Sequence, residues 1–266
     1  MHEMKINSWP NFELDEINKT LEILNSGKVN YWTGEEGKFF EREFAEKVGT
    51  KYAIALANGS LALSSAYLSI GLSPGDEIIT SPRTFIATAS SAILLGAKPI
   101  FADVDPDSGA ITADTIQPLI TNKTKAISVV HLGGWPADME SICKLAQNFG
   151  LKVIEDCAQA HGAKFKGISV GSFGNVSAWS FCQEKILSTG GEGGMITTSN
   201  KEVWDRIWSF KDHGKNYLKI VDNKKSNSFK FVHDNLGSNF RMTEIQSGIG
   251  RIQLSKLETW HAKRKK

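Results

Sequence analysis

Short apolar runs that alternate with helical patterns fill the middle of the sequence, and they constrain its fold more than any other feature. The runs are rich in Ile, Val and Ala and are separated mostly by stretches of helical periodicity. Unbroken apolar runs are typical of parallel strands buried on both faces. The pattern predicts an α/β fold with a mostly parallel, seven-stranded sheet and helices on both faces. The seven predicted strands are 52–56, 77–80, 99–102, 126–130, 152–155, 176–181 and 195–198.

Helical patterns flank this region at both ends of the chain. A helix is predicted over 11–26, where apolar residues recur every three or four positions, and a second helix is predicted to end at Gly49. Another helix is predicted over 242–260. Residues 213–240 are rich in Asn, Lys and Asp and are expected to form a mobile or partner-contacting loop. The apolar row of the first helix consists of Leu14, Ile17, Leu21 and Leu24.

Composition excludes several classes of protein. A net charge of +2 over 266 residues gives no electrostatic basis for nucleic-acid binding. Cys143, Cys157 and Cys182 are too far apart for a CxxC pair, which argues against a zinc site or a disulfide framework and fits a reducing compartment. The sequence contains no signal-peptide pattern and no apolar run of about 20 residues, so we expect a cytoplasmic protein without a membrane span.

A single lysine, Lys185, lies between two of the predicted strands, 176–181 and 195–198, and is followed by four glycines. A lysine in such a segment can be buried, can have a lowered pKa and can be approached closely by a ligand, as a Schiff-base lysine requires. A lysine in a hairpin loop is also often an ordinary surface residue. The residues that follow the other strands must decide between these interpretations.

In a parallel α/β sheet, ligands bind at the carboxyl ends of the strands. Gly59 and Ser60 open a helix after the first strand and form either a phosphate seat or a simple N-cap. Phe85 follows the second strand as a ring platform or a core residue. Asp156 follows the fifth; it either faces a cation such as a pyridinium N–H or caps the next turn. Together with Lys185, these residues provide what pyridoxal phosphate (PLP) requires.

Six motifs, in order and over nearly the whole chain, resemble those of the DegT/DnrJ/EryC1/StrS family of PLP-dependent sugar aminotransferases. The resemblance implies the fold type I (aspartate aminotransferase-like) architecture. It also implies transfer of an amino group from an amino acid, typically glutamate, to a keto group of a nucleotide-linked sugar in glycan or polysaccharide biosynthesis. The motifs are Ser73-Pro74-Gly75-Asp76-Glu77, Thr84-Phe85-Ile86-Ala87-Thr88-Ala89, Ile154 to Ala163 (IEDCAQAHGA), Ser180-Phe181-x3-Lys185, Gly191-Glu192-Gly193-Gly194-Met195 and Asn239-Phe240-Arg241-Met242.

The resemblance also implies the roles of individual residues. Lys185 would form the Schiff base with the cofactor and carry the proton during transfer. Asp156 would pair with the pyridine N–H, and Gln159 would face the ring or its 3-oxygen. Phe85 would stack on the ring. The phosphate would be held by Gly59, Ser60, Ser180 and, from the neighbouring subunit of a homodimer, Asn239.

The resemblance implies a division of the chain into three segments. The sequence departs from the family pattern in two places, at its C-terminal end and at Cys182. We expect an N-terminal helical segment at 1–50, the PLP-binding α/β large domain at 51–240 and the start of a helix at 241–266. In the family this helix leads to a small C-terminal domain, which we expect to be absent or truncated. Cys182 stands where the family often has His.

Two alternatives stay open, and a third is excluded. Related PLP-dependent sugar dehydratases carry His in place of the Schiff-base lysine, so Lys185 argues against that activity. A PLP-binding remnant without turnover is the second alternative, motivated by the expectation that the C-terminal domain is absent or truncated. A dinucleotide-binding protein is excluded because the glycines between 190 and 194 do not follow GxGxxG spacing and are followed at once by a strand.

Overall fold

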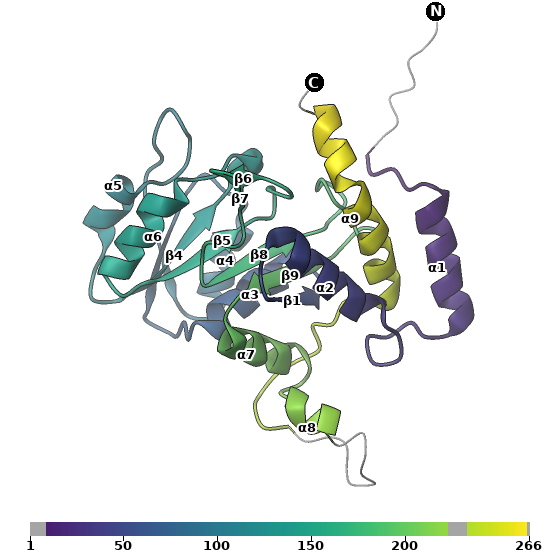
Figure 1. Cartoon of the computed structure of the whole chain (residues 1–266). Coiled ribbons are helices and arrows are strands. Elements are labelled where there is room, and N and C mark those ends of the chain that lie inside the picture. Colours follow the sequence, from purple (N-terminus) through teal and green to yellow (C-terminus); the bar gives the residue numbers. More distant parts are fainter. Residues whose placement is uncertain (1–8, 223–232, 265–266) are drawn as a thin grey trace, which may run out of the picture.

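The computed structural model describes residues 9–222 and 233–264, which form a sheet with helices on both faces (Figure 1). The strands are β1 (Tyr52–Leu56), β2 (Glu77–Thr80), β3 (Lys98–Phe101), β4 (Thr124–Val130), β5 (Lys152–Asp156), β6 (Lys164–Phe165), β7 (Ile168–Ser169), β8 (Val176–Ser180) and β9 (Gly194–Thr198). The α-helices are α1 (Leu14–Ser26), α2 (Glu36–Val48), α3 (Gly59–Ser69), α4 (Ala87–Ile93), α5 (Ala113–Ile116), α6 (Met139–Asn148), α7 (Lys201–Lys211), α8 (Tyr217–Asp222) and α9 (Glu244–Arg264). Two 3-10 turns are η1 (Gln117–Leu119) and η2 (Leu132–Gly134).

The main sheet has seven strands in the order β1-β9-β8-β5-β4-β2-β3. Strands β3, β2, β4, β5 and β8 are parallel, whereas β9 runs antiparallel to both β1 and β8. All seven predicted strands are present and the sheet is mostly parallel, so the predicted fold class is confirmed. The antiparallel pair β6–β7 was not predicted, because two-residue strands carry no periodic signal.

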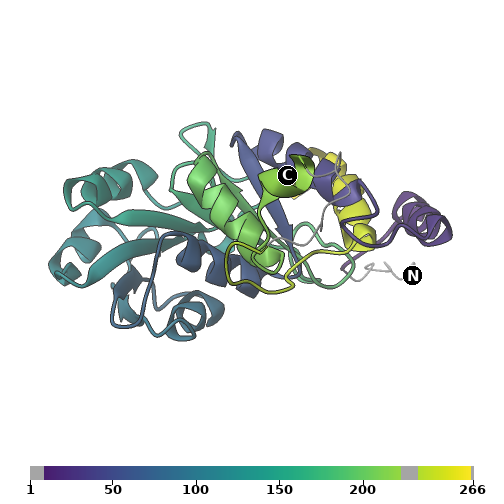
Figure 2. The ribbon, with the colours of Figure 1, turned by 90° about the horizontal axis from the view of Figure 1, so that it is seen from below.

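Alternate side chains of the strands pack into cores on opposite faces of the sheet. Ile54 and Leu56 of β1 pack with α3 and α7, while Ala53 and Ala55 of the same strand pack with α2 and α9. Farther along the sheet, Val153 of β5 packs with α6 on the face opposite α3. Figure 2 shows the ribbon from below, with α7 lying along one face. Helices therefore cover both faces, as the apolar runs predict.

Most helix ends agree with the sequence pattern. Gly27 and Gly49, with φ angles of 67° and 84°, end α1 and α2 in the left-handed conformation that glycine adopts without strain. The helix predicted over 242–260 begins at Glu244 and continues to Arg264. Helix α8 lies inside the predicted loop 213–240; residues 223–232 of that loop lie outside the described part of the chain.

Helices α1 and α9 lie side by side (Figure 1), joined by a buried polar contact. The carboxylate of Glu16, buried on α1, accepts hydrogen bonds from Gln253 (3.1 Å) and Lys256 (2.9 Å) of α9. Ile23 is the buried apolar residue of α1. The predicted helix is therefore confirmed, but its apolar row does not face the protein: Leu14, Ile17, Leu21 and Leu24 are 46–74% exposed.

Candidate active site

A cavity of about 510 Å³ opens at the carboxyl ends of β5 and β8, beside the first turn of α3. This is the edge of a parallel sheet at which ligands bind. Seven of the eight predicted site residues line the cavity, although they come from four separate parts of the chain. They are Gly59, Ser60, Phe85, Asp156, Gln159, Ser180 and Lys185.

Asp156 is the last residue of β5 and is buried. Its Oδ2 accepts a hydrogen bond from the Thr88 hydroxyl (2.7 Å), and its Oδ1 accepts one from the Ala158 N–H (3.1 Å). One oxygen thus caps the following turn, as the alternative interpretation predicts, while the carboxylate still borders the cavity. Burial raises the pKa of Asp156, although these hydrogen bonds oppose the shift. A cationic N–H in the cavity would offset the cost of burying this charge.

The N-terminus of α3 approaches β8 closely. Asn58 caps the helix by accepting a hydrogen bond from the Leu61 N–H (2.9 Å). A Cβ on Gly59 would lie 2.6 Å from Cβ of Ser180, so only glycine permits this approach. The first amides of a helix have no intrahelical acceptor, and they carry the positive end of the helix dipole. Together with the hydroxyls of Ser60 and Ser180, they form a seat that fits a phosphate group.

Lys185 lies on the loop between the antiparallel strands β8 and β9 and is half-buried. Its backbone N–H donates to the Cys182 carbonyl (3.0 Å), which forms a turn at the mouth of the cavity. Lys185 thus lies in a hairpin loop, where an ordinary surface lysine was the alternative interpretation. It also lines the cavity that holds Asp156, as a Schiff-base lysine requires. Cys182, which departs from the family pattern, lines the same cavity.

Helix α9 holds the loop that carries Lys185. The side chain of Gln253 accepts a hydrogen bond from the Ser188 N–H (3.3 Å), and that of Gln246 donates to the Glu192 carbonyl (2.7 Å). Gly194, the first residue of β9 after this loop, lies against backbone of the protein. A Cβ on Gly194 would lie 2.3 Å from the Asn58 carbonyl oxygen, so glycine is required there by the protein's own packing, whereas a Cβ on Gly191 would meet no atom within 4 Å.

Gln159 and Phe85 occupy two further sides of the cavity. The Gln159 Oε1 accepts a hydrogen bond from the Gly133 N–H (2.7 Å), which leaves the amide group of this side chain as a donor. Phe85 is 67% exposed, so its alternative interpretation as a core residue is wrong. An exposed ring at the rim of a cavity fits a stacking platform.

Asn239 is the one predicted residue that does not line this cavity. It is exposed and forms an isolated antiparallel bridge with Asp212. The carboxylate of Asp212 pairs with Arg241 (2.9 Å) and Lys215 (3.0 Å), so the backbone around Asn239 is anchored. Its predicted contact with a cofactor of a neighbouring subunit stays a prediction.

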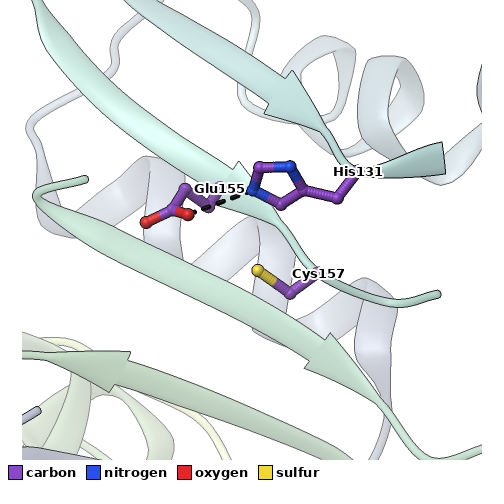
Figure 3. Close-up of side chains that lie close together, drawn as sticks. All are labelled: His131, Glu155 and Cys157. Carbon is purple, nitrogen blue, oxygen red and sulfur yellow. Dashed lines mark hydrogen bonds and ion pairs between the residues drawn. The ribbon is translucent and has the colours of Figure 1, made fainter. Parts of the chain in front are cut away.

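His131, Glu155 and Cys157 lie close together at the carboxyl ends of β4 and β5, in a set that resembles metal ligands (Figure 3). His131 Nδ1 accepts a hydrogen bond from the Ala137 N–H (3.2 Å), so Nε2 carries the proton and donates to Glu155 (3.1 Å). Glu155 also accepts hydrogen bonds from the amides of residues 171, 173 and 174. Burial and the neighbouring carboxylates raise the pKa of the Cys157 thiol. Every ring nitrogen and carboxylate oxygen of the cluster is thus engaged in a hydrogen bond within the protein, and these bonds brace the end of β5.

Two contacts of the site were not predicted from the sequence. Thr88 donates to Asp156, and Trp9 donates to the backbone carbonyl of Lys185 (2.8 Å). Thr88 lies in one of the six motifs, but nothing in the sequence pointed to its contact with Asp156. No signal pointed to Trp9, which is 176 residues from its partner.

His161 predicts a pH dependence of stability. It is buried between the rings of Trp179 and Phe181, and the loss of hydration, followed by the charge of Lys185, lowers its pKa to about 3. The folded protein keeps His161 neutral, whereas the unfolded chain binds a proton below the usual pKa near 6.5. The contribution of His161 to the free energy of unfolding is therefore fully present above pH ~6.5. Below that pH it declines by about 1.4 kcal/mol per pH unit.

Urea unfolding at pH 7, 6 and 5 measures this decline. A His161→Phe variant keeps an aromatic ring in place and should lose less stability between pH 7 and 5 than the unaltered protein, by about 2 kcal/mol. The carboxylates titrate in both proteins and cancel in the comparison. Equal losses in the two proteins would contradict the buried, neutral state of His161.

The sheet order, the lysine on the loop after β8, and the aspartate that ends β5 beside a helix N-terminus define the large domain of an aspartate aminotransferase-like protein. The profile of the DegT/DnrJ/EryC1/StrS aminotransferase family matches residues 10–266. The chain belongs to this family.

Two curated relatives are similar in sequence. The GDP-perosamine synthase of Escherichia coli O157:H7 is 40% identical over 250 residues, which cover 93% of this chain and 66% of the relative. The UDP-N-acetyl-3-dehydro-alpha-D-glucosamine 3-aminotransferase of Acidithiobacillus ferrooxidans is also 40% identical over 250 residues, covering 92% of this chain and 64% of the relative. The chain thus spans slightly less than two thirds of the length of these relatives.

Two solved structures are similar in fold. An aminotransferase from Psychrobacter cryohalolentis has a TM-score of 0.95 and 50% identity, with 97% of this chain and 65% of that chain covered. The NtdA protein of Bacillus subtilis, solved with the bound cofactor PMP, has a TM-score of 0.80 and 30% identity, with 92% and 53% covered. Among the helices of the described residues, none is long and apolar enough to cross a membrane.

Proposed function

We propose that the protein is a PLP-dependent aminotransferase that moves an amino group from glutamate to a keto group of a nucleotide-linked sugar. The observation that carries this proposal is the convergence of Lys185, Asp156 and the N-terminus of α3 on one cavity. The names of the two curated relatives, which include a GDP-linked and a UDP-linked sugar, support the substrate class. A role in the biosynthesis of glycans or polysaccharides is supported by the name of a spore coat polysaccharide biosynthesis protein of Bacillus subtilis, 37% identical to this chain.

The residues of the cavity fit PLP. The α3 amides at Gly59 and Ser60, with Ser180, would hold the phosphate, because hydroxyl and amide donors converge there. Asp156 would hold the ring nitrogen, since its buried carboxylate has no cationic hydrogen-bond partner among the described residues. Phe85 would cover one ring face and Gln159 would donate to a ring substituent. When bound, the cofactor supplies an aldehyde that condenses with amines and an electron-withdrawing ring that stabilises negative charge.

The residues of the chain would act on the bound cofactor in three ways. Asp156 holds a proton on the ring nitrogen because its carboxylate is buried and directed by Thr88. The ε-amine of Lys185 would hold the cofactor covalently and would accept and return a proton at the reacting carbon. Glu155 and His131 keep the end of β5 rigid beneath them.

Further features of the proposal follow the family. We propose a cytoplasmic homodimer in which Asn239, which is exposed, reaches the phosphate bound by the neighbouring subunit. We also propose the division of the chain into segments 1–50, 51–240 and 241–266, the last of which begins the helix toward a small C-terminal domain. Size measurement in solution tests the dimer, and an Asn239→Ala variant with weaker PLP binding would support the contact between subunits.

The half-reaction with glutamate tests the proposed function. The purified protein should gain visible absorbance with PLP, and glutamate should convert it to the pyridoxamine form with release of 2-oxoglutarate. A nucleotide-linked keto-sugar should then regenerate the absorbance. Protein that binds PLP but does not respond to glutamate would support the alternative of a remnant without turnover. Protein that stays colourless would contradict both, and the dehydratase alternative has no observation in its favour because Lys185 is present.

A further inference from the structure

The indole of Trp9 contacts the loop that carries the lysine of the site. Its Nε1–H donates a hydrogen bond of 2.8 Å to the backbone carbonyl oxygen of Lys185. Trp9 precedes α1, so this bond joins the beginning of the described chain to the loop at the mouth of the cavity. The hydrogen bond has a normal length for an N–H donor and a carbonyl acceptor.

Helix α9 fixes the position of the Trp9 ring. The ring of Trp260 packs edge-to-face against it, with a centroid distance of 5.4 Å and an interplanar angle of 89°. The guanidinium of Arg264 lies over the same ring at 5.7 Å. Edge-to-face and cation–π contacts of this kind orient an aromatic side chain as well as bury it. Trp9 is 39% exposed, so these contacts, rather than deep burial, hold it.

The Trp9 bond completes the support of the Lys185 backbone. On the N-terminal side of its Cα, the Lys185 N–H bonds to the Cys182 carbonyl. On the C-terminal side, the carbonyl accepts from Trp9. Because each peptide group is planar, two hydrogen bonds that flank one Cα fix both adjoining planes and thereby the direction in which the side chain leaves the backbone.

We propose that Trp9 is a positioning residue that orients Lys185 toward its cofactor, through the hydrogen bond to the Lys185 carbonyl. The inference rests on the proposed function, because it needs the ε-amine of Lys185 to bond covalently to PLP. It adds a role for the N-terminal segment and for the end of α9, neither of which lines the cavity of the site. Trp9 acts only through Lys185, so its effect must disappear when the lysine side chain is removed.

The test measures PLP affinity by equilibrium dialysis in four full-length proteins: the unaltered chain, Trp9→Phe, Lys185→Ala and the double variant. Phenylalanine keeps a ring against Trp260 and removes the N–H donor. Trp9→Phe should weaken PLP binding about fivefold in the chain with Lys185, the size of one hydrogen bond. It should leave the affinity of Lys185→Ala unchanged. The fraction of PLP that borohydride links to the protein should fall in parallel.

Several results of this experiment would overturn the positioning role of Trp9. Equal weakening in both backgrounds, or no weakening in either, would overturn the positioning role. Failure of Trp9→Phe to fold would overturn it too, because the role requires an intact fold around a partly exposed residue; thermal unfolding detects this. Trp204→Phe removes an indole N–H that donates to the Ala53 carbonyl, away from the cavity; it is the matched control and should bind PLP like the unaltered chain. If the unaltered chain binds PLP no more tightly than Lys185→Ala, the proposed function fails instead.

Discussion

Replacing Lys185 by alanine is expected to abolish the borohydride-reducible link to PLP and to lower amino transfer by a factor on the order of 10⁴ or more. The variant loses both the amine that bonds to the cofactor and the group that moves the proton. Noncovalent binding of PLP should persist, because the α3 N-terminus, Ser180 and Asp156 are unchanged. Absorbance spectra with and without borohydride, together with single-turnover rates with glutamate, measure both effects.

A matched lysine variant controls for nonspecific effects of lost charge. Lys125 is an exposed lysine on β4, away from the cavity, and Lys125→Ala should retain both the covalent link and the rate. Lys185 is half-buried, so its removal should change the thermal unfolding temperature little. A Lys185→Ala protein that still yields a reduced PLP adduct at a specific residue would show that another amine carries the chemistry.

Replacing Asp156 by asparagine is expected to lower turnover by about two to four orders of magnitude while leaving the fold intact. Asparagine can still accept the hydrogen bond from Thr88, but it cannot hold a charged ring N–H. Rates with glutamate and the spectrum of bound PLP measure the loss. Glu140→Gln, an exposed carboxylate substitution on α6, is the matched control and should have no effect.

The same substitution should leave the stability of the cofactor-free protein nearly unchanged. Burial raises the pKa of Asp156 in the folded state, so its ionised form is unfavourable there and destabilises the fold as pH rises through the usual pKa of the unfolded chain. The substituted amide carries no charge and removes this cost, but its NH2 group cannot accept the hydrogen bond from the Ala158 N–H, so cofactor-free Asp156→Asn should be about as stable as the unaltered protein at pH 7. Loss of stability together with loss of activity would indicate a structural role for Asp156.

Much of the candidate site was predictable because its residues follow strands. The apolar runs located the ends of β5 and β8, and the rule that ligands bind there singled out Asp156 and Lys185. Cavity-lining residues were thus identified without coordinates. The residues that hydrogen-bond to them were not identified. Thr88 contacts Asp156 from another element, and Trp9 contacts Lys185, from which it is 176 positions away in the sequence. No local pattern encodes such tertiary contacts.

The fold was predictable in its periodic parts only. All seven strands of the main sheet were identified, whereas the pair β6–β7 and the short helix α8 were not. The apolar row of α1 predicted the helix but not its orientation, because Glu16 forms the buried contact with α9. Hydrophobic periodicity does not predict that a carboxylate is buried and paired with a residue such as Lys256.

A covalent bond between Lys185 and PLP, in the cavity that holds Asp156, is the step on which the proposed activity depends. Peptide mapping by mass spectrometry, after incubation with PLP and reduction with borohydride, detects this bond at the level of single residues. We expect one reduced PLP adduct at stoichiometric yield on the peptide that contains Lys185, and its loss when glutamate is added before the borohydride. The absence of an adduct, or adducts scattered over exposed lysines, would contradict the proposed role of Lys185.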